Sequence, residues 1–210
     1  MPNYAHHTFE HGGIALWHIT ETADELYAQL GTTKYDTQLS EKKNDARRAE
    51  WLAVRLLIKD LFDPDAEVVY HPTGRPYLKE SSTYISISHT RGYAAVAYST
   101  EGPIGLDIEH ISDRVERIAD RFTSPAEAEY IDTHEQQERV LYHLINWSAK
   151  ETLYKLLDDT SMAEFKIAFH IAPYTLSPQG SLDATILASD EKKVAVHYRL
   201  FSDFVCTWAS

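Results

Sequence analysis

The sequence predicts an α+β protein with two similar lobes related by a pseudo-twofold, each with a small antiparallel sheet packed against helices. Three observations predict this class. Helical and strand periods occur in both halves of the 210-residue chain. Turn signals separate neighbouring strand segments. Gly102-Pro103 interrupts the chain near its middle. We therefore expect an N-terminal lobe over residues 1–102 and a C-terminal lobe over residues 103–210.

The first half contains two helical patterns followed by short strands. Gly31 stands where the C-terminal cap of the first helix belongs, and Pro64 ends the second. The expected elements are a strand over residues 14–19, helices over 22–30 and 45–61, and strands over 67–70, 84–88 and 93–99.

The second half opens with a strand and continues with helices. Ser124 and Glu127 form a capping-box pattern around Pro125, which marks a helix start. The expected elements are a strand over residues 104–109, helical segments over 114–122 and 135–157, and strands over 165–171, 194–200 and 204–208.

The composition restricts the possible functions. The formal net charge is −12, from 20 basic and 32 acidic residues, which disfavours a general nucleic-acid or membrane-surface binder. Cys206 is the single cysteine, so no intrachain disulfide is possible. No apolar run approaches the roughly 18–20 residues that span a bilayer, and we expect a soluble, cytoplasmic protein.

The clustered His6, His7 and His11 are interpreted as a solvated N-terminal tail, with weak metal binding the less favoured alternative.

Two carboxylates share one face of the strand at 104–109. Side chains alternate along a strand, so Asp107 and Glu109 point one way while Leu106 and Ile108 point the other. Neighbouring carboxylates repel each other unless a proton or cation intervenes. A hard divalent metal and a wet acidic edge strand both remain possible from this segment alone.

A second pattern lies on the long helix near residue 150. Trp147, Glu151 and Lys155 are spaced by four and lie along one helix face. An exposed Glu–Lys pair is the plainer interpretation. The large aromatic residue on the same face favours a phosphate site instead, with Glu151 on a metal and Lys155 on the oxygens.

Hydroxyl groups and an imidazole meet at the end of the strand over residues 84–88. Ser86 and Ser88 share a face, and His89 follows where the chain turns. This arrangement suits phosphate binding, whereas a turn-capping histidine is the alternative. A serine hydrolase is disfavoured because the chain has no Gly-x-Ser-x-Gly sequence.

Two further basic groups are candidates for anion binding. Arg75 stands between Gly74 and Pro76 in a turn. Arg48 and Arg55 flank Trp51 on one helix face, where they either pack on the surface or bind phosphate.

Taken in order, these segments resemble one family. The sequence runs through Gly-Arg-Pro at residue 74, Ile-Ser-Ile-Ser-His-Thr at residue 85, Ile-Gly-Leu-Asp-Ile-Glu at residue 104, and Trp-Ser-Ala-Lys-Glu-Thr-Leu-Tyr-Lys at residue 147. It resembles the 4′-phosphopantetheinyl transferases, specifically the long pseudo-dimeric surfactin-synthetase type. The resemblance covers residues 47–155, and the chain lacks the glycine that the family often has in the loop after Lys155.

The resemblance implies an activity and a set of roles. Such an enzyme transfers the 4′-phosphopantetheine arm of coenzyme A to a serine of an apo acyl, polyketide or peptidyl carrier protein, and it releases 3′,5′-ADP. The implied site lies at the lobe interface of a monomer. Its implied Mg²⁺ ligands are Asp107, Glu109 and Glu151; its implied contacts to coenzyme A are Arg48, Arg75, Ser88, His89, Lys150 and Lys155, with Arg75 near the 3′-phosphate.

The resemblance also implies how the reaction proceeds. Glu151, Lys155 and His89 are expected to act in catalysis, and either Glu151 or a metal-bound water takes the serine proton. A helper role for Glu127 competes with its capping role. Another metal-dependent phosphotransferase and a non-catalytic coenzyme A-binding module remain as alternatives.

The resemblance further implies a carrier that is acidic along the helix after its serine. Arg114, Arg117 and Arg121 are spaced three and four apart and would form one basic helix face for it. A solvated basic face that balances nearby acids is the alternative.

Overall fold

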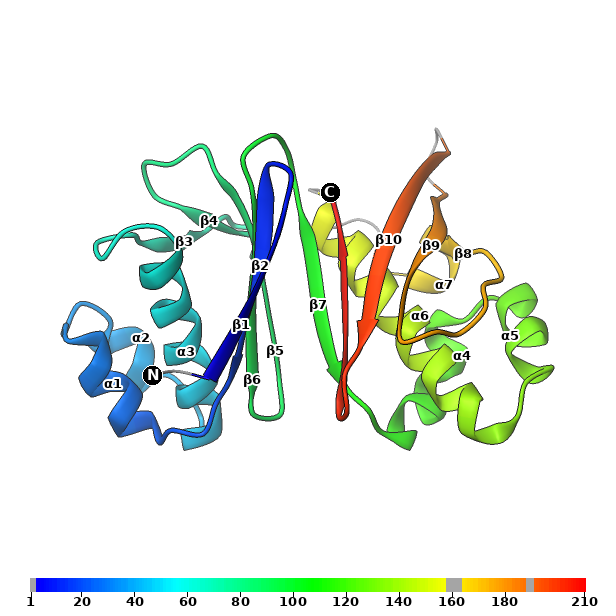
Figure 1. Cartoon of the computed structure of the whole chain (residues 1–210), viewed down its shortest axis with the longest axis horizontal. Coiled ribbons are helices and arrows are strands. Elements are labelled where there is room, and N and C mark those ends of the chain that lie inside the picture. The colour runs from blue at the N-terminus through cyan, green and yellow to red at the C-terminus, as the bar shows by residue number, and fades with distance from the viewer. Residues whose placement is uncertain (1–2, 158–163, 188–190) are drawn as a thin grey trace. The chain divides into compact units, whose positions relative to one another are not determined.

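The computed structural model describes residues 3–157, 164–187 and 191–210 of the chain. They divide into two compact units, Met1–Gly102 and Pro103–Ser210 (Figure 1). Each unit pairs an antiparallel sheet with helices, which confirms the predicted α+β class. The pseudo-twofold relation of the lobes stays a prediction. None of the described helices is both long and apolar enough to cross a membrane.

The first unit contains a four-stranded sheet, a small two-stranded sheet and three helices. Its elements are β1 (Asn3–Phe9), β2 (Gly12–His18), α1 (Ala23–Leu30), α2 (Asp36–Ser40), α3 (Asp45–Leu61), β3 (Val68–Tyr70), β4 (Pro76–Leu78), β5 (Tyr84–Thr90) and β6 (Tyr93–Ser99). The strand order is β1-β2-β6-β5 in the larger sheet, and β3 pairs with β4.

The core of this unit lies between α3 and the larger sheet. Trp17 from β2 and Leu52 from α3 are buried there. Asn44 caps α3 by accepting a hydrogen bond from the amide of Arg47. Gly31 ends α1 with a φ of 66°, the left-handed conformation that glycine adopts without strain. The predicted helix at 45–61 is therefore confirmed with its boundaries.

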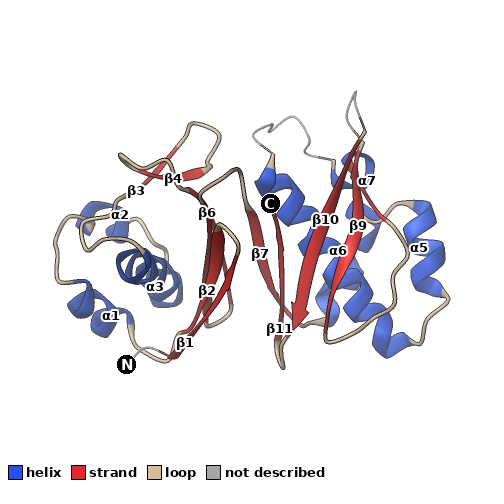
Figure 2. Cartoon of the chain, turned by 45° about the horizontal axis from the view of Figure 1, so that its top comes forward, coloured by secondary structure: helices blue, strands red, loops and turns tan. Residues whose placement is uncertain are grey.

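The second unit contains a five-stranded sheet and a long helix. Its elements are β7 (Gly105–His110), the 3₁₀ helix η1 (Asp113–Ile118), α4 (Ala119–Phe122), α5 (Pro125–Asp132), α6 (Gln136–Leu156), α7 (Phe165–Ala168), β8 (Phe169–Ile171), β9 (Gln179–Ile186), β10 (Lys192–Leu200) and β11 (Phe204–Ala209). The strand order is β7-β11-β10-β9-β8, and helix α6 packs on β7 and β11 (Figure 2).

Two predicted segments differ from the sequence-based expectation. The N-terminal residues are not a solvated tail, because Asn3–Phe9 pairs with β2 along its whole length. The apolar pattern could not predict this strand, since the residues at 5–8 are exposed on both faces. Within the described residues, no three His, Cys, Asp or Glu side chains form a metal-binding group, so the histidine alternative gains no support.

The segment at 165–171 is only partly a strand. Its first four residues form α7, because Phe165 turns onto the rings of Trp147 and Tyr154, with centroids 5.5 and 5.4 Å away. Ile167 is 64% exposed and contributes little to the core. Tertiary packing thus overrides the period-two pattern here. In the loop after Lys155, residues 158–160 lie outside the described part of the chain.

A close approach between β7 and α6 depends on Gly105. A Cβ atom at this position would overlap the backbone carbonyl oxygen of Thr152. Backbone atoms cannot move aside as a flexible side chain can, so only glycine lets the strand and the helix pack at this distance.

We expect Gly105→Ala to destabilise the protein by about 1–3 kcal/mol, as overpacking does. Thermal unfolding measures this, with Gly102→Ala as the matched control, because a Cβ at Gly102 meets no atom within 4 Å. Equal melting temperatures for the two variants would show that β7 and α6 do not need this close approach.

Candidate active site

The carboxylates of Asp107 and Glu109 both point from β7 toward helix α6. The hydroxyl of Ser148 donates a hydrogen bond to Asp107 Oδ2 at 2.9 Å, and the indole Nε1 of Trp147 donates to Glu109 Oε1 at 2.9 Å. The prediction that the two acids share one face of the strand is confirmed. Their neighbours Leu106 and Ile108, on the opposite face, are fully buried, although β7 is the outermost strand of its sheet.

Helix α6 adds an amine to this group. Lys155 Nζ donates to Asp107 Oδ1 at 2.7 Å, so Asp107 receives donors on both carboxylate oxygens. Ser148 lies 2.8 Å from the hydroxyl of Thr207 on β11, which in turn lies 2.6 Å from the hydroxyl of Thr152. This buried hydroxyl chain fixes the donor that orients Asp107.

The acidic group is electrostatically strained. Burial raises the pKa of Glu109, and the charge of Asp107 raises it further, while the hydrogen bond from Trp147 lowers it. Burial and the charges of Asp107 and Glu109 raise the pKa of Glu151 to about 7, against the opposing effect of Lys155. Within the described residues no side chain donates a hydrogen bond to Glu151. Its negative charge is therefore the least compensated of the three.

The donor chemistry of this group fits Mg²⁺. Asp107, Glu109 and Glu151 offer only carboxylate oxygens, the ligands that hard divalent cations prefer. Among the described residues no three His, Cys, Asp or Glu side chains are placed to hold one metal ion together, these three included. Mg²⁺ does not require one, because it commonly uses one or two carboxylates together with water and substrate phosphates.

In the first unit, His89 belongs to a small cluster at the end of β5. Its Nδ1 lies 3.1 Å from the carboxylate of Glu50 and 2.9 Å from Nη1 of Arg47, and these two α3 residues pair at 2.8 Å. Either contact anchors the imidazole through Nδ1 and orients its Nε2. His89 itself is about 40% exposed.

The other expected ligand contacts of this unit lie on different elements. Ser88 is buried on β5, one residue before His89. Arg75 is half-buried in the turn between β3 and β4, where Gly74 has a φ of 88°. Arg48 on α3 pairs with Asp45 at 3.4 Å, and its buried Nε has no hydrogen-bond partner within the described residues. The location of an active site at the lobe interface stays a prediction.

Arg55 is a structural residue in this unit. Its guanidinium stacks on the ring of Trp51 at 3.5 Å and donates to the Tyr70 hydroxyl at 3.2 Å. It is 6% exposed, so of the two arginines that flank Trp51 only Arg48 is presented toward the surface.

Lys150 requires a correction. We expected it to contact coenzyme A, yet the structure buries it completely and turns it toward α5. Its Nζ donates to Glu127 at 2.8 Å and to the carbonyl oxygen of Phe122 at 2.7 Å. Burial lowers the pKa of Lys150, and the charge of Glu127 opposes that shift. Because Glu151 follows it directly on the helix, the two side chains point in different directions.

Glu127 consequently has a structural explanation. It completes the predicted capping box with Ser124 and also accepts a hydrogen bond from the amide of Ile171 at 2.8 Å. Its carboxylate thus joins α5, α6 and β8, and no catalytic role is needed to account for it.

Sequence reasoning missed four residues that orient the candidate site: Arg47, Glu50, Ser148 and Thr207. Ser148, Glu151 and Lys155 are spaced three and four apart and so share one helix face. This spacing could have indicated that Ser148 contacts Asp107. The pairing of Thr207 with Asp107 across β11 and β7 depends on strand order, which one sequence does not reveal.

The site lies within a segment that matches a known family. Residues 103–209 match the 4′-phosphopantetheinyl transferase superfamily. They make up half of the chain, and the chain therefore belongs to this superfamily.

Curated relatives agree with this assignment. The 4′-phosphopantetheinyl transferase AcpT of Escherichia coli O157:H7 is 33% identical over 113 residues, which are 52% of this chain and 57% of that protein. AcpT of Salmonella typhimurium is 28% identical over 123 residues, 57% of this chain and 64% of that protein. The 4′-phosphopantetheinyl transferase psf-1 of Bacillus pumilus is 28% identical over 162 residues, 64% of this chain and 68% of that protein. The matched segments thus span about half to two thirds of these relatives.

We expect Glu127→Gln to cost about 3–5 kcal/mol of stability, because it leaves the buried ammonium of Lys150 without its counter-charge. Thermal unfolding in the absence of ligands measures this. Glu129→Gln, on an exposed position of the same helix, should change the melting temperature little. Similar melting temperatures for both variants would mean that the buried ion pair of Glu127 and Lys150 does not stabilise the unit.

A second prediction concerns pH. The folded-state pKa of Glu151 is about 7, against 4.5 for an ordinary glutamate, so the folded state holds the proton more tightly than the unfolded chain does. Ionising Glu151 therefore reduces stability as pH rises from about 4.5 to 7. With EDTA present, Glu151→Gln should melt a few degrees above the wild type at pH 8, and the difference should shrink toward zero at pH 5.

Glu138→Gln, at an exposed position of the same helix, is the control and should show no such pH dependence. A variant that melts at the wild-type temperature at pH 8 would contradict the electrostatic strain at Glu151.

Proposed function

We propose that this chain transfers the 4′-phosphopantetheine arm of coenzyme A to a serine of an apo carrier protein and releases 3′,5′-ADP. The observation that carries the proposal is the convergence of Asp107, Glu109, Glu151 and Lys155 between β7 and α6, inside the segment that matches the superfamily. A carboxylate group with an adjacent amine suits a metal-bound pyrophosphate.

Asp107, Glu109 and Glu151 would hold Mg²⁺ in this proposal. When bound, the cation would neutralise charge on the pyrophosphate and on the departing 3′,5′-ADP. Ser148 and Trp147 keep the first two carboxylates oriented by their hydrogen bonds. Fixed ligands of this kind lose little entropy when the cation binds.

The basic residues would contact the phosphates. Lys155 would neutralise oxygens of the transferred phosphoryl group from its position next to Asp107, and His89, oriented by Arg47 and Glu50, would donate to the same group. Arg75 would contact the 3′-phosphate. Arg48 and Ser88 would add further contacts to coenzyme A. Lys150 has no role in ligand binding here.

The attacking serine must lose a proton. Among the described carboxylates of the site, Glu151 is the one to which no side chain donates a hydrogen bond. We infer that Glu151 can accept this proton, since its pKa of about 7 lies close to neutral pH, where a general base acts best.

One experiment separates the proposal from its alternatives. The protein is incubated with coenzyme A, Mg²⁺ and an apo carrier protein, and the intact mass of the carrier and the released nucleotide are measured. A carrier that gains one phosphopantetheine arm as 3′,5′-ADP appears supports the proposal. Binding of coenzyme A without any mass gain would indicate a non-catalytic module, and transfer of another phosphoryl group would indicate a different phosphotransferase.

Two substitutions should weaken this reaction to different degrees. Asp107→Asn removes a proposed metal ligand and should lower turnover by more than about 100-fold. Ser148→Ala removes only the hydrogen-bond donor that orients Asp107. Loss of a residue that orients a metal ligand typically lowers activity by about 10- to 100-fold, and we expect that decrease in turnover here. Near-normal turnover of Asp107→Asn at millimolar Mg²⁺ would place the metal elsewhere.

The proposed carrier contact is the basic segment after β7. Arg114, Arg117 and Arg121 are all exposed. The first two lie on η1 rather than on an α-helix; residues three apart eclipse one another on a 3₁₀ helix, so they form one row. Ile118 is half-buried and Phe122 fully buried, which directs the arginines outward.

Arg117→Glu should raise the KM for an acidic carrier several-fold and leave the affinity for coenzyme A unchanged. The effect should weaken as salt rises, because screening acts over about 10 Å at 0.1 M. Lys193→Glu, an exposed charge reversal on β10, is the matched control. An equal effect of both variants would move the carrier contact away from η1.

A further inference from the structure

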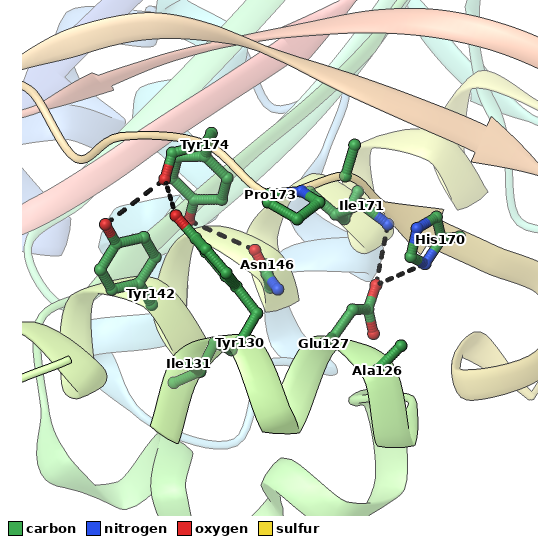
Figure 3. Close-up of a pocket in the computed structure, with 11 residues that line it drawn as sticks. Ala126, Glu127, Tyr130, Ile131, Tyr142, Asn146, His170, Ile171, Pro173 and Tyr174 are labelled. Atoms are coloured by element: carbon green, nitrogen blue, oxygen red, sulfur yellow. Dashed lines mark hydrogen bonds and ion pairs between the residues drawn. The ribbon is translucent and has the colours of Figure 1, made fainter. Parts of the chain in front are cut away.

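A pocket of about 160 Å³ lies in the second unit between α5, α6 and the chain that follows β8 (Figure 3). It lies against the face of α6 that carries Tyr142 and Asn146. Glu151 and Lys155 project from a largely opposite face, because residues five apart on a helix differ by about 140°. The pocket is therefore separate from the carboxylate site.

Three tyrosine rings form the wall of this pocket, and hydrogen bonds hold them in place. The hydroxyl groups of Tyr130 and Tyr142 donate to the carbonyl oxygen of Tyr174 at 2.6 and 3.4 Å. The Tyr142 ring packs against the other two rings, with centroid distances of 5.9 and 5.1 Å. Because these hydroxyl groups are already engaged, the rings offer apolar surface to a ligand, and Pro173 extends that surface.

One polar group remains available to a ligand. Asn146 is 3% exposed and accepts a hydrogen bond from the Tyr174 hydroxyl at 3.3 Å. Within the described part of the chain, its amide nitrogen has no hydrogen-bond partner. This nitrogen is not one of the fully buried polar atoms that lack a partner, so it stays accessible, and an acceptor on a ligand could pair with it.

No lysine or arginine is among the described residues that line the pocket, so the wall offers an anion no permanent positive charge. Glu127 lines the pocket, but its carboxylate already accepts hydrogen bonds from Lys150, Ser124 and Ile171. Burial raises the pKa of Tyr142, which indicates a medium that disfavours added negative charge. With Glu127 neutralised by Lys150, a cation gains no free partner there either.

The volume limits the size of the ligand. An engineered apolar cavity of about 150 Å³ binds benzene, so this pocket accepts one six-membered ring with a small substituent. Tyr130 and His170 are only partly buried, so a ligand would enter the pocket past these two side chains.

We propose that this pocket binds a small neutral aromatic molecule, such as a phenol, with its ring against the tyrosines and its oxygen accepting a hydrogen bond from Asn146. This inference goes beyond the proposed transfer reaction and does not depend on it.

Phenol is the probe, titrated into the full chain and followed by ligand-observed NMR. We expect saturable binding with a Kd of about 0.1–1 mM, in keeping with the efficiency of very small ligands. Toluene lacks the acceptor and benzoate carries a charge, so each should bind at least about tenfold more weakly. Equal binding of benzoate and phenol, or no saturation at about ten times the expected Kd, would overturn the proposal.

Variants locate the binding site. Ala126→Phe fills the pocket from α5 and should abolish phenol binding. Ala46→Phe is the matched control, because Ala46 is likewise an exposed alanine at the second position of a helix but does not line the pocket; it should bind phenol normally. A loss in the control, or undiminished binding to a folded Ala126→Phe, would contradict the assignment.

Asn146→Leu provides a second test if Ala126→Phe fails to fold. It should bind phenol and toluene with equal affinity, because the donor that distinguishes them is gone. A preference for phenol that survives this substitution would show that Asn146 does not recognise the oxygen.

Discussion

The contact between β7 and α6 is the constraint on which the rest of the site depends. Gly105 lets the strand approach the helix backbone at Thr152, and this approach brings Asp107 within hydrogen-bonding distance of Ser148 and Lys155. Three carboxylates then occupy one partly buried region, where burial, together with the charges of Asp107 and Glu109, raises the pKa of Glu151. A fold does not retain such strain for stability, because like charges in a buried place oppose folding. The proposed function accounts for this strain, because a cation and a phosphate would offset the clustered charges.

Much of this arrangement could be predicted from local pattern. Period-two alternation placed Asp107 and Glu109 on one face, and the spacing of four along the helix placed Glu151 and Lys155 together. The capping box at Ser124 and the boundaries of α3 also followed from sequence. These features depend only on the residues within one element.

The missed features depend on contacts between elements. The resemblance implied that Lys150 contacts coenzyme A, yet neighbouring helix residues point in different directions, and its amine meets Glu127 of α5. Glu50 reaches His89 from another element, which no local pattern reveals. The strand at Asn3–Phe9 is held by backbone pairing with β2 rather than by an apolar face, and α7 forms because Phe165 packs on Trp147.

We propose that these carboxylates present a divalent cation to the pyrophosphate of coenzyme A. Calorimetric titration of coenzyme A in saturating Mg²⁺ and in EDTA tests it most directly, because ligands that share a contact must strengthen each other's binding. The account predicts that Mg²⁺ tightens coenzyme A binding by at least about tenfold, within the usual range of such coupling, and that this gain disappears in Asp107→Asn. Equal affinity with and without Mg²⁺ would contradict the account.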